Sequence, residues 1–318
     1  MSALLPPIEL RRMFVEAATA KFASNVPDFV RLRQMVEDNG GRFHNDHGAI
    51  RTADPAVCAL FVRAARAIGL HRELDYSFPA KKLQSFDLQV IGEDAGQFKI
   101  FVSQVDLAAF PQEIAALIRE DCAEQAAAVD HTALNALIAK AESAGGLAAN
   151  DAASFIDLVV QELMSRPGPP LQRRTLAAVA AHSGEAASAL ALGPDFNHIT
   201  IDVGTAGYAD IEAMAAAMAQ RGFPMLPAIQ GARGTKLRQT ATMAATMRTP
   251  VREDDGSVGA AATEKQFVEI IQRAQARDRD GVPLWTQHGA PLVFRSFLAA
   301  NAEKIFDAAS TKAGTLAC

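Results

Sequence analysis

The spacing of hydrophobic residues predicts helices at the start of the chain. Apolar residues recur at helical spacing over residues 8–17. Residues 27–38 predict a second helix, which ends before the glycine pair at 40–41. We therefore interpret residues 1–41 as an N-terminal helical segment.

A strand, a helix and further strands are predicted next, over residues 42–106. RFHNDHGAIRT (42–52) lacks helical periodicity and lies between turn signals, so it predicts a strand. The Asp-Pro pair at 54–55 supplies an N-cap and a proline at the first helical position, which predicts a helix. SFDLQVIG (85–92) and QFKIFVSQV (97–105) alternate polar and apolar residues and predict two strands, joined by a turn at residues 93–96.

An inserted helical region is predicted over residues 107–195. The sequence is rich in alanine and suits three or four helices, broken at residues 145–146 and 166–170. His131 and His182 have no partner at ligand spacing here, so we interpret both as structural or surface residues.

The same order of elements then returns. FNHITIDV (196–203) predicts a strand, followed by a helix that ends near residue 221, and KLRQTATMA (236–244) predicts another strand. REDDGSVGAAAT (252–263) reads as a polar loop that leads to FVEIIQR (267–273). Strand, helix and strands thus occur twice, which indicates an architectural repeat.

Composition and charge narrow the class of protein. Hydrophobic residues make up 49% of the chain and charged residues 21%, with a formal charge of −5 and a pI near 5.8. These values predict a soluble protein without a basic nucleic-acid-binding surface, and the number and spacing of the cysteines favour a reducing cytoplasm. The N-terminus does not resemble a secretory signal, and no apolar run is long enough to suggest a membrane span. The three cysteines are far apart and form no CxxC motif, so neither a disulfide framework nor a thiolate zinc site is expected.

Two histidines on the predicted strands are candidates for chemistry. Successive residues of a strand point to opposite faces, so His198 shares a face with Thr200, and His47 shares a face with Arg51. If the two copies of the repeat pack as pseudo-symmetric halves, the imidazoles of His47 and His198 converge. A carboxylate from a later strand would complete the two-histidine, one-carboxylate set that is typical of non-haem Fe(II) oxygenases. On spacing alone, a structural role for each histidine stays open.

Five segments, in this order, carry a family resemblance. They are HGAIR (47–51), FNHITIDV, LRQT (237–240), FVEIIQR and FRSFLAANAEKIF (294–306). Together they resemble the 2-oxoadipate dioxygenase/decarboxylase family, also called hydroxyglutarate synthases, of the vicinal-oxygen-chelate superfamily. The resemblance implies an α+β fold in which two vicinal-oxygen-chelate-type strand-helix-strand modules form a metal cleft. The first module is 42–106, and the second, with a C-terminal helix, is 196–318; the helical region is inserted between them.

The resemblance also implies a site and a reaction. His47, His198 and Glu269 would bind Fe(II) or another divalent metal, and Arg51 would bind a substrate carboxylate and assist catalysis. The family reaction takes a 2-oxo acid and O2, releases CO2, and leaves a 2-hydroxy acid one carbon shorter. One alternative is a metal-dependent isomerase, hydrolase or lyase on the same fold, without redox chemistry. A second is a binding module whose cleft has lost activity, which the complete set of three candidate ligands argues against.

Three positions are less settled by the pattern. FVEIIQR also carries apolar residues at helical spacing, so propensity alone favours a helix with an exposed Glu269, whereas the resemblance favours a strand from about residue 266 to 273. Arg238 is a candidate for binding substrate, although Arg238 and Gln239 have opposite strand parity and only one of them can face the cleft. Ala300-Asn301 stands where the family has a Val-Ser pair, so we expect Asn301 near the far end of the substrate.

Overall fold

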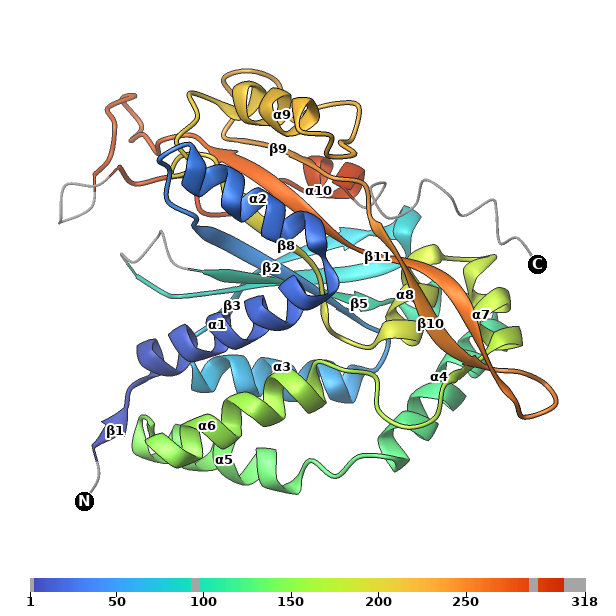
Figure 1. The fold of residues 1–318 in the computed structure, drawn as a ribbon. Coiled ribbons are helices and arrows are strands. Elements are labelled where there is room, and N and C mark those ends of the chain that lie inside the picture. The colour runs from blue at the N-terminus through green and yellow to red at the C-terminus, as the bar shows by residue number, and fades with distance from the viewer. Residues whose placement is uncertain (1–2, 93–97, 286–290, 306–318) are drawn as a thin grey trace.

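The computed structural model describes residues 3–92, 98–285 and 291–305 of the chain. Within these residues, nine strands form one mixed sheet (Figure 1). Eight of them follow one another across the sheet in the order β3 (His71–Phe78), β4 (Leu83–Gln89), β5 (Lys99–Val105), β2 (Asn45–Thr52), β8 (Phe196–Asp202), β11 (Val258–Arg273), β10 (Ala245–Arg252) and β7 (Leu171–Gln172). The ninth, β9 (Leu237–Ala241), pairs with the C-terminal part of β11.

The sheet consists of two halves that are built alike. β2 and β8 run antiparallel at its centre, β2 is parallel to β5, and β8 is parallel to β11. The helix α3 (Pro55–Ala67) connects β2 to β3, and α9 (Ile211–Gln220) connects β8 to β9. The predicted repeat of strand, helix and strands is therefore confirmed, and so is the α+β class.

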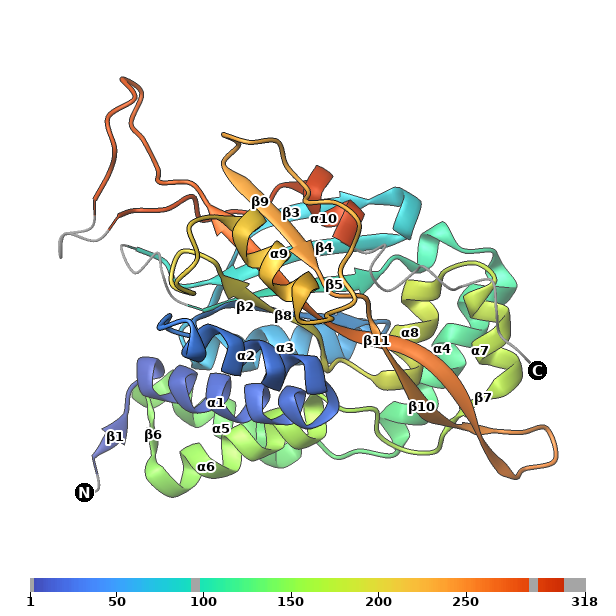
Figure 2. The same ribbon diagram turned by 45° about the horizontal axis from the view of Figure 1, so that its top comes forward.

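Helices cover one face of the sheet (Figure 2). Ile50, Ile100, Ile199 and Ile270 point from the central strands into a core that these helices complete. Besides α3 and α9, the helices are α1 (Pro7–Asn25), α2 (Pro27–Asp38), α5 (Thr132–Ala144) and α6 (Ala149–Asp157), which continues as a π-helical segment (Leu158–Leu163). A two-stranded pair, β1 (Leu4–Leu5) with β6 (Leu147–Ala148), lies beside α1 and α6.

The other face is polar at its centre. At one end it packs against the rest of the helical region, where Ala186 and Ala187 of α8 join a core with Ala49 and Phe101. The helices on this side are α4 (Gln112–Ala127), α7 (Arg173–Ala180), α8 (Gly184–Leu192) and the C-terminal α10 (Ala299–Ile305). Polar side chains near the middle of the sheet are thus enclosed between the strands and this second layer.

The structure corrects three expectations. β3 was not predicted, although Leu74, Tyr76 and Phe78 alternate with polar residues; most of the strand is exposed. Residues 252–263 are not a simple loop: β10 and β11 form a long antiparallel hairpin whose turn lies between Arg252 and Val258. The helical region contains five α-helices among the described residues, rather than three or four. The turn predicted at 93–96 lies outside the described residues.

Other expectations are confirmed. α2 spans the predicted residues, and the Asp54 carboxylate accepts a hydrogen bond from the Ala56 amide at the start of α3. FVEIIQR lies within β11, so it is a strand. No helix in the described part of the chain is long and apolar enough to cross a membrane.

Candidate metal centre

Three side chains converge on the polar face of the sheet. They are His47 of β2, His198 of β8 and Glu269 of β11, and one potential ligand atom from each lies within 4.8 Å of the others. The Nε2 atoms of His47 and His198 lie 3.3 Å and 3.4 Å from Oε2 of Glu269. The three residues are only 2%, 6% and 1% exposed, so the site is enclosed.

Strand register explains why these residues meet. His47 lies opposite Thr200 on β8, and Thr200 lies opposite Glu269 on β11. Residues opposite each other share a face, so the alternation that buries Ile199 and Ile201 beneath the helices turns His198 and Thr200 toward the site.

Two β-bulges adjust this register next to the histidines. Asn45 pairs with Ile201 and His47 with Thr200, which leaves Asp46 as an extra residue on β2. Asn45 turns to the helical side, where it donates to the Thr19 hydroxyl, whereas Asp46 reaches the same side as His47. A bulge redirects a side chain in this way because it breaks the strict alternation of the strand.

The second bulge lies on β8. Ala49 pairs with His198 and Ile50 with Phe196, so Asn197 is the extra residue. The Phe196 ring then packs on the backbone of Gly48, where an added Cβ would lie 2.5 Å from a ring carbon. Glycine at position 48 is therefore required by this close approach.

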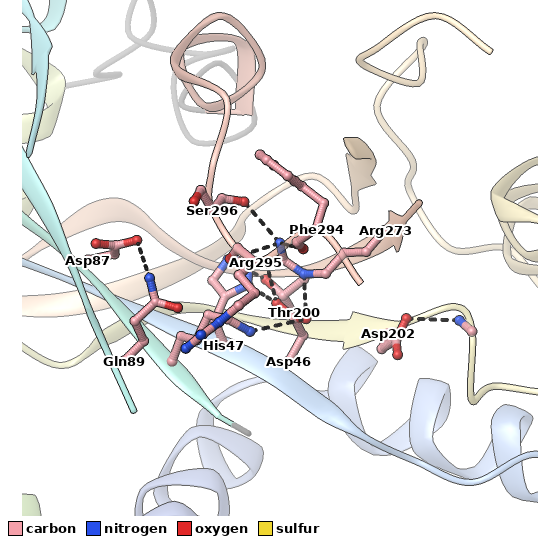
Figure 3. A network of polar contacts seen from close by, with 12 residues as sticks. Asp46, His47, Asp87, Gln89, Thr200, Asp202, Arg273, Phe294, Arg295 and Ser296 are labelled. Carbon is pink, nitrogen blue, oxygen red and sulfur yellow. Dashed lines mark hydrogen bonds and ion pairs between the residues drawn. The ribbon is translucent and has the colours of Figure 1, made fainter. Parts of the chain in front are cut away.

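His47 is held by a charged network behind it (Figure 3). Its Nδ1 lies 2.8 Å from Oδ1 of Asp46, and Asp46 forms a bidentate ion pair with Arg273 at 2.7 Å and 2.8 Å. Burial favours the neutral acid, but the charges of Arg273 and Lys99 hold the pKa of Asp46 well below its usual range. Burial alone would lower the pKa of His47, yet hydrogen bonds to Asp46 and Glu269 raise it. The carboxylate thus fixes the ring so that Nε2 faces the other ligands.

His198 has a different environment. Its ring stacks on Phe267 with the centroids 4.6 Å apart. Burial, together with the positive charges of His47 and Arg51, holds the pKa of His198 well below its usual range. His198 is therefore a neutral imidazole, which is the form that binds a metal.

The acidic corner of the site involves Thr200 and Glu269. The Thr200 hydroxyl donates to Oε2 of Glu269 at 2.6 Å and lies 3.0 Å from Nε2 of His47. Oε1 of Glu269 is buried and finds no hydrogen-bond partner among the described residues. A buried carboxylate oxygen without a donor is costly unless a cation compensates it. Two imidazoles and one carboxylate with this geometry fit a divalent transition metal.

Comparison with known families identifies the chain. The family model described as 2-oxoadipate dioxygenase/decarboxylase matches residues 14–289. The chain belongs to this family. The match covers the strands that carry His47, His198 and Glu269, so the candidate metal centre lies within the residues that match the family model.

Solved structures agree with this assignment at the level of the fold. A glyoxalase-superfamily protein from Ralstonia eutropha JMP134 is 21% identical, with a TM-score of 0.76 over 87% of this chain and 85% of that one. Hydroxyglutarate synthase from Oryza sativa, in complex with 2-oxoadipate, is 17% identical, with a TM-score of 0.73 over 97% and 95%. The enzyme from Pseudomonas putida is 20% identical, with a TM-score of 0.71 over 100% and 77%. No curated protein matches the chain. The chain therefore has the fold of the vicinal-oxygen-chelate superfamily.

The candidate substrate residues of this family member lie in different places. Arg51 shares the face of His47 and forms a buried ion pair with Glu185 of α8, at 2.9 Å. Arg238 shares no face with Glu269, because its register partner on β11 is Gln272, and its guanidinium pairs with Glu212 of α9 at 2.7 Å and 2.8 Å.

Of Arg238 and Gln239, it is Gln239 that lies on the face of the metal ligands. Gln239 pairs with Ile271 on β11 and is buried. Asn301 is also buried, and its amide donates to the Leu237 carbonyl at 3.0 Å, which ties α10 to β9.

Several residues that build the site were not found from the sequence. Asp46 and Glu185 lie outside the segments that carry the resemblance, and Arg273 and Phe297 lie inside such segments but were given no role. A charged residue directly before a candidate histidine ligand was the one available signal, and it indicates a partner for the second ring nitrogen.

Proposed function

We propose that the protein is an Fe(II)-dependent dioxygenase that converts a 2-oxo acid, 2-oxoadipate or a close analogue, into a 2-hydroxy acid one carbon shorter. One O2 is consumed and one CO2 is released. Both oxygen atoms of O2 are accounted for, because the products contain two more oxygen atoms than the 2-oxo acid. The convergence of His47, His198 and Glu269 in a member of this family is the observation that carries the proposal.

The three ligands leave further positions on the metal open. When bound, Fe(II) supplies Lewis acidity toward the 2-oxo acid and the redox chemistry that O2 requires. The chain's part is to hold the ligands rigidly. Asp46 fixes the ring of His47 through Nδ1, and Thr200 fixes one oxygen of Glu269.

Arg51 is proposed to bind and orient the substrate. It lies on the same strand face as His47, and its charge acts on His198. A guanidinium binds a carboxylate through two parallel hydrogen bonds, so it can fix both the position and the direction of the substrate. Glu185 holds Arg51 from the helical region, which makes α8 part of the substrate site.

Aromatic side chains exclude water from the site. The Phe297 ring lies 4.8 Å from the His47 ring and 5.0 Å from the Phe101 ring. A dry enclosure strengthens the interactions of Arg51 with a carboxylate and protects reactive species from hydrolysis or proton leakage.

The experiment combines metal analysis with O2 uptake. Protein purified without oxygen is assayed for bound iron and then for O2 consumption with a panel of 2-oxo acids. We expect one metal per chain, O2 uptake with 2-oxoadipate or an analogue, and equal amounts of CO2. His47→Ala, His198→Ala and Glu269→Ala should each lose the metal, whereas His182→Ala, at an exposed histidine, should keep it. Full metal occupancy in any of the three variants, or turnover that uses no O2, would overturn the proposal.

A further inference from the structure

The metal centre is connected to a distant part of the chain by one buried arginine. Arg273 ends β11, four residues after Glu269 and on the same face, and its side chain is only 2% exposed. Its Nε and Nη2 atoms donate to the Asp46 carboxylate. Its Nη1 atom donates to the carbonyls of residues 294, 295 and 296, at 3.0 Å, 3.2 Å and 3.0 Å. Figure 3 shows the guanidinium between Asp46 and these carbonyls.

Residues 294–297, the covering segment, place the Phe297 ring against the metal ligand His47. Phe297 contacts the His47 ring edge to face, and the Arg273 guanidinium carbon lies 5.4 Å from the Phe297 ring centre. The covering segment is also bound to the first half of the fold. The Phe297 amide donates to the Tyr76 hydroxyl at 3.3 Å, and Arg295 donates to the carbonyls of Val90 and Gly92.

One carboxylate therefore serves two partners. Asp46 accepts from His47 on one side and from Arg273 on the other, so the orientation of a metal ligand and the position of the covering segment depend on the same group. Lysine could not replace this arginine, because its single nitrogen cannot present a planar fork to Asp46 and bind three carbonyls at once.

We propose that Arg273 is a positioning residue that couples metal binding at His47 to docking of the covering segment over the site. A metal on Nε2 restrains the His47 ring, the ring restrains Asp46, and Asp46 restrains Arg273 and the three carbonyls. Coupling of this kind is reciprocal, so docking of the segment strengthens metal binding by the same factor. The inference rests on the metal centre proposed above.

The test uses Co(II) alone as the probe and hydrogen exchange of backbone amides as the readout. Exchange in peptides that contain residues 294–298 is compared with and without saturating Co(II), and the Co(II) dissociation constant is measured in parallel. In the wild-type protein we expect Co(II) to slow this exchange by about 5- to 150-fold, the usual range for coupled sites. Peptides from α4, away from the metal ligands, should not respond.

Three variants separate coupling from stability. Arg273→Lys should reduce the Co(II)-dependent slowing of exchange to less than about twofold. The Co(II) dissociation constant should rise by about the same factor as the slowing falls, because the coupling is reciprocal. Asp46→Asn breaks the same connection at its other end and should give the same loss. It provides the test if Arg273→Lys does not fold. Tyr76→Phe removes a bond of the covering segment outside the connection. It should speed exchange with and without Co(II) and leave their ratio unchanged.

The outcomes are distinguishable. Wild-type protein that binds Co(II) with no change in exchange at 294–298 would overturn the coupling and leave the metal centre intact. Retention of the full Co(II)-dependent slowing in Arg273→Lys or Asp46→Asn would also overturn it. Failure of the wild-type protein to bind Co(II) would overturn the metal centre and the coupling together.

Discussion

The buried pair of Arg51 and Glu185 allows the proposed substrate role to be separated from a structural one. The two side chains are 6% and 5% exposed and 2.9 Å apart. Arg51→Ala removes one charge of this pair, which typically costs about 3–5 kcal/mol of folding free energy. If Arg51 also binds the substrate carboxylate, the lost charged hydrogen bond costs about 1.5–3 kcal/mol more in the transition state, or roughly 10- to 150-fold in kcat/KM.

The decisive variant replaces both partners. Arg51→Met combined with Glu185→Leu removes the buried charges together, and exchanges of this kind are often neutral for stability. We expect the double variant to regain a free energy of unfolding within about 1 kcal/mol of wild type, while kcat/KM stays as low as in Arg51→Ala. The kcat/KM of Arg51→Lys should lie between those of wild type and Arg51→Ala, because lysine keeps the charge and loses the fork.

The assay is denaturant unfolding for each variant, followed by kcat/KM for the best 2-oxo acid, corrected for bound iron. None of these changes alters a metal ligand, so iron content should be retained throughout. Wild-type kcat/KM in folded, iron-loaded Arg51→Ala would remove Arg51 from the substrate site. Recovery of kcat/KM in the double variant would show that the arginine matters only for stability.

Three further predictions concern the surroundings of the site and the core. Thr200→Val should weaken Co(II) binding by about 10- to 100-fold because Glu269 loses its hydroxyl donor, and Thr200→Ser should restore it; unchanged affinity in the valine variant would contradict this. Gly48→Ala should lower the free energy of unfolding by about 1–3 kcal/mol through overlap with Phe196, and Phe196→Leu should relieve part of that loss in thermal unfolding; an alanine variant as stable as wild type would count against the close packing. Burial raises the pKa of Cys58 to about 11 and that of Cys122 to about 12. Mass spectrometry after brief treatment with a thiol reagent at about pH 8 should find both unlabelled in the native protein, since less than roughly 1% of either is thiolate there, and rapid native labelling would refute this.

Local patterns predicted the parts of the fold that local forces determine. FNHITIDV alternates strictly after Asn197, so the face of His198 and Thr200 followed from the sequence. The cap at Asp54 followed from side-chain chemistry that acts within two residues. FVEIIQR has apolar residues at helical spacing, and pairing with β8 and β9, which are distant in sequence, makes it a strand.

The bulge at Asp46 could not be predicted by the same means. Strict alternation places Asp46 on the opposite face from His47, and so hides its contact with Arg273. An extra residue is recognised only when the partner strand is known, because a bulge is defined by the register between two paired strands. The pairing of Arg51 with Glu185 has the same origin, since it depends on how α8 packs across β2.

The bulges in the two halves of the repeat differ in whether they provide a hydrogen-bond partner for the neighbouring histidine. Each bulge places a polar residue directly before a histidine, Asp46 before His47 and Asn197 before His198. Asp46 binds Nδ1 of its neighbour, whereas Nδ1 of His198 and Oδ1 of Asn197 are buried and have no hydrogen-bond partner within the described part of the chain.

A charged network thus makes one ligand rigid, and the other is held mainly by stacking on Phe267. The charge of Arg51 affects the second ligand, His198, because it contributes to the low pKa of that imidazole. Under the proposed function the substrate carboxylate therefore binds on the side of His198. The covering segment packs Phe297 against His47, the ligand that the charged network holds, and Arg51 extends from the same strand, β2.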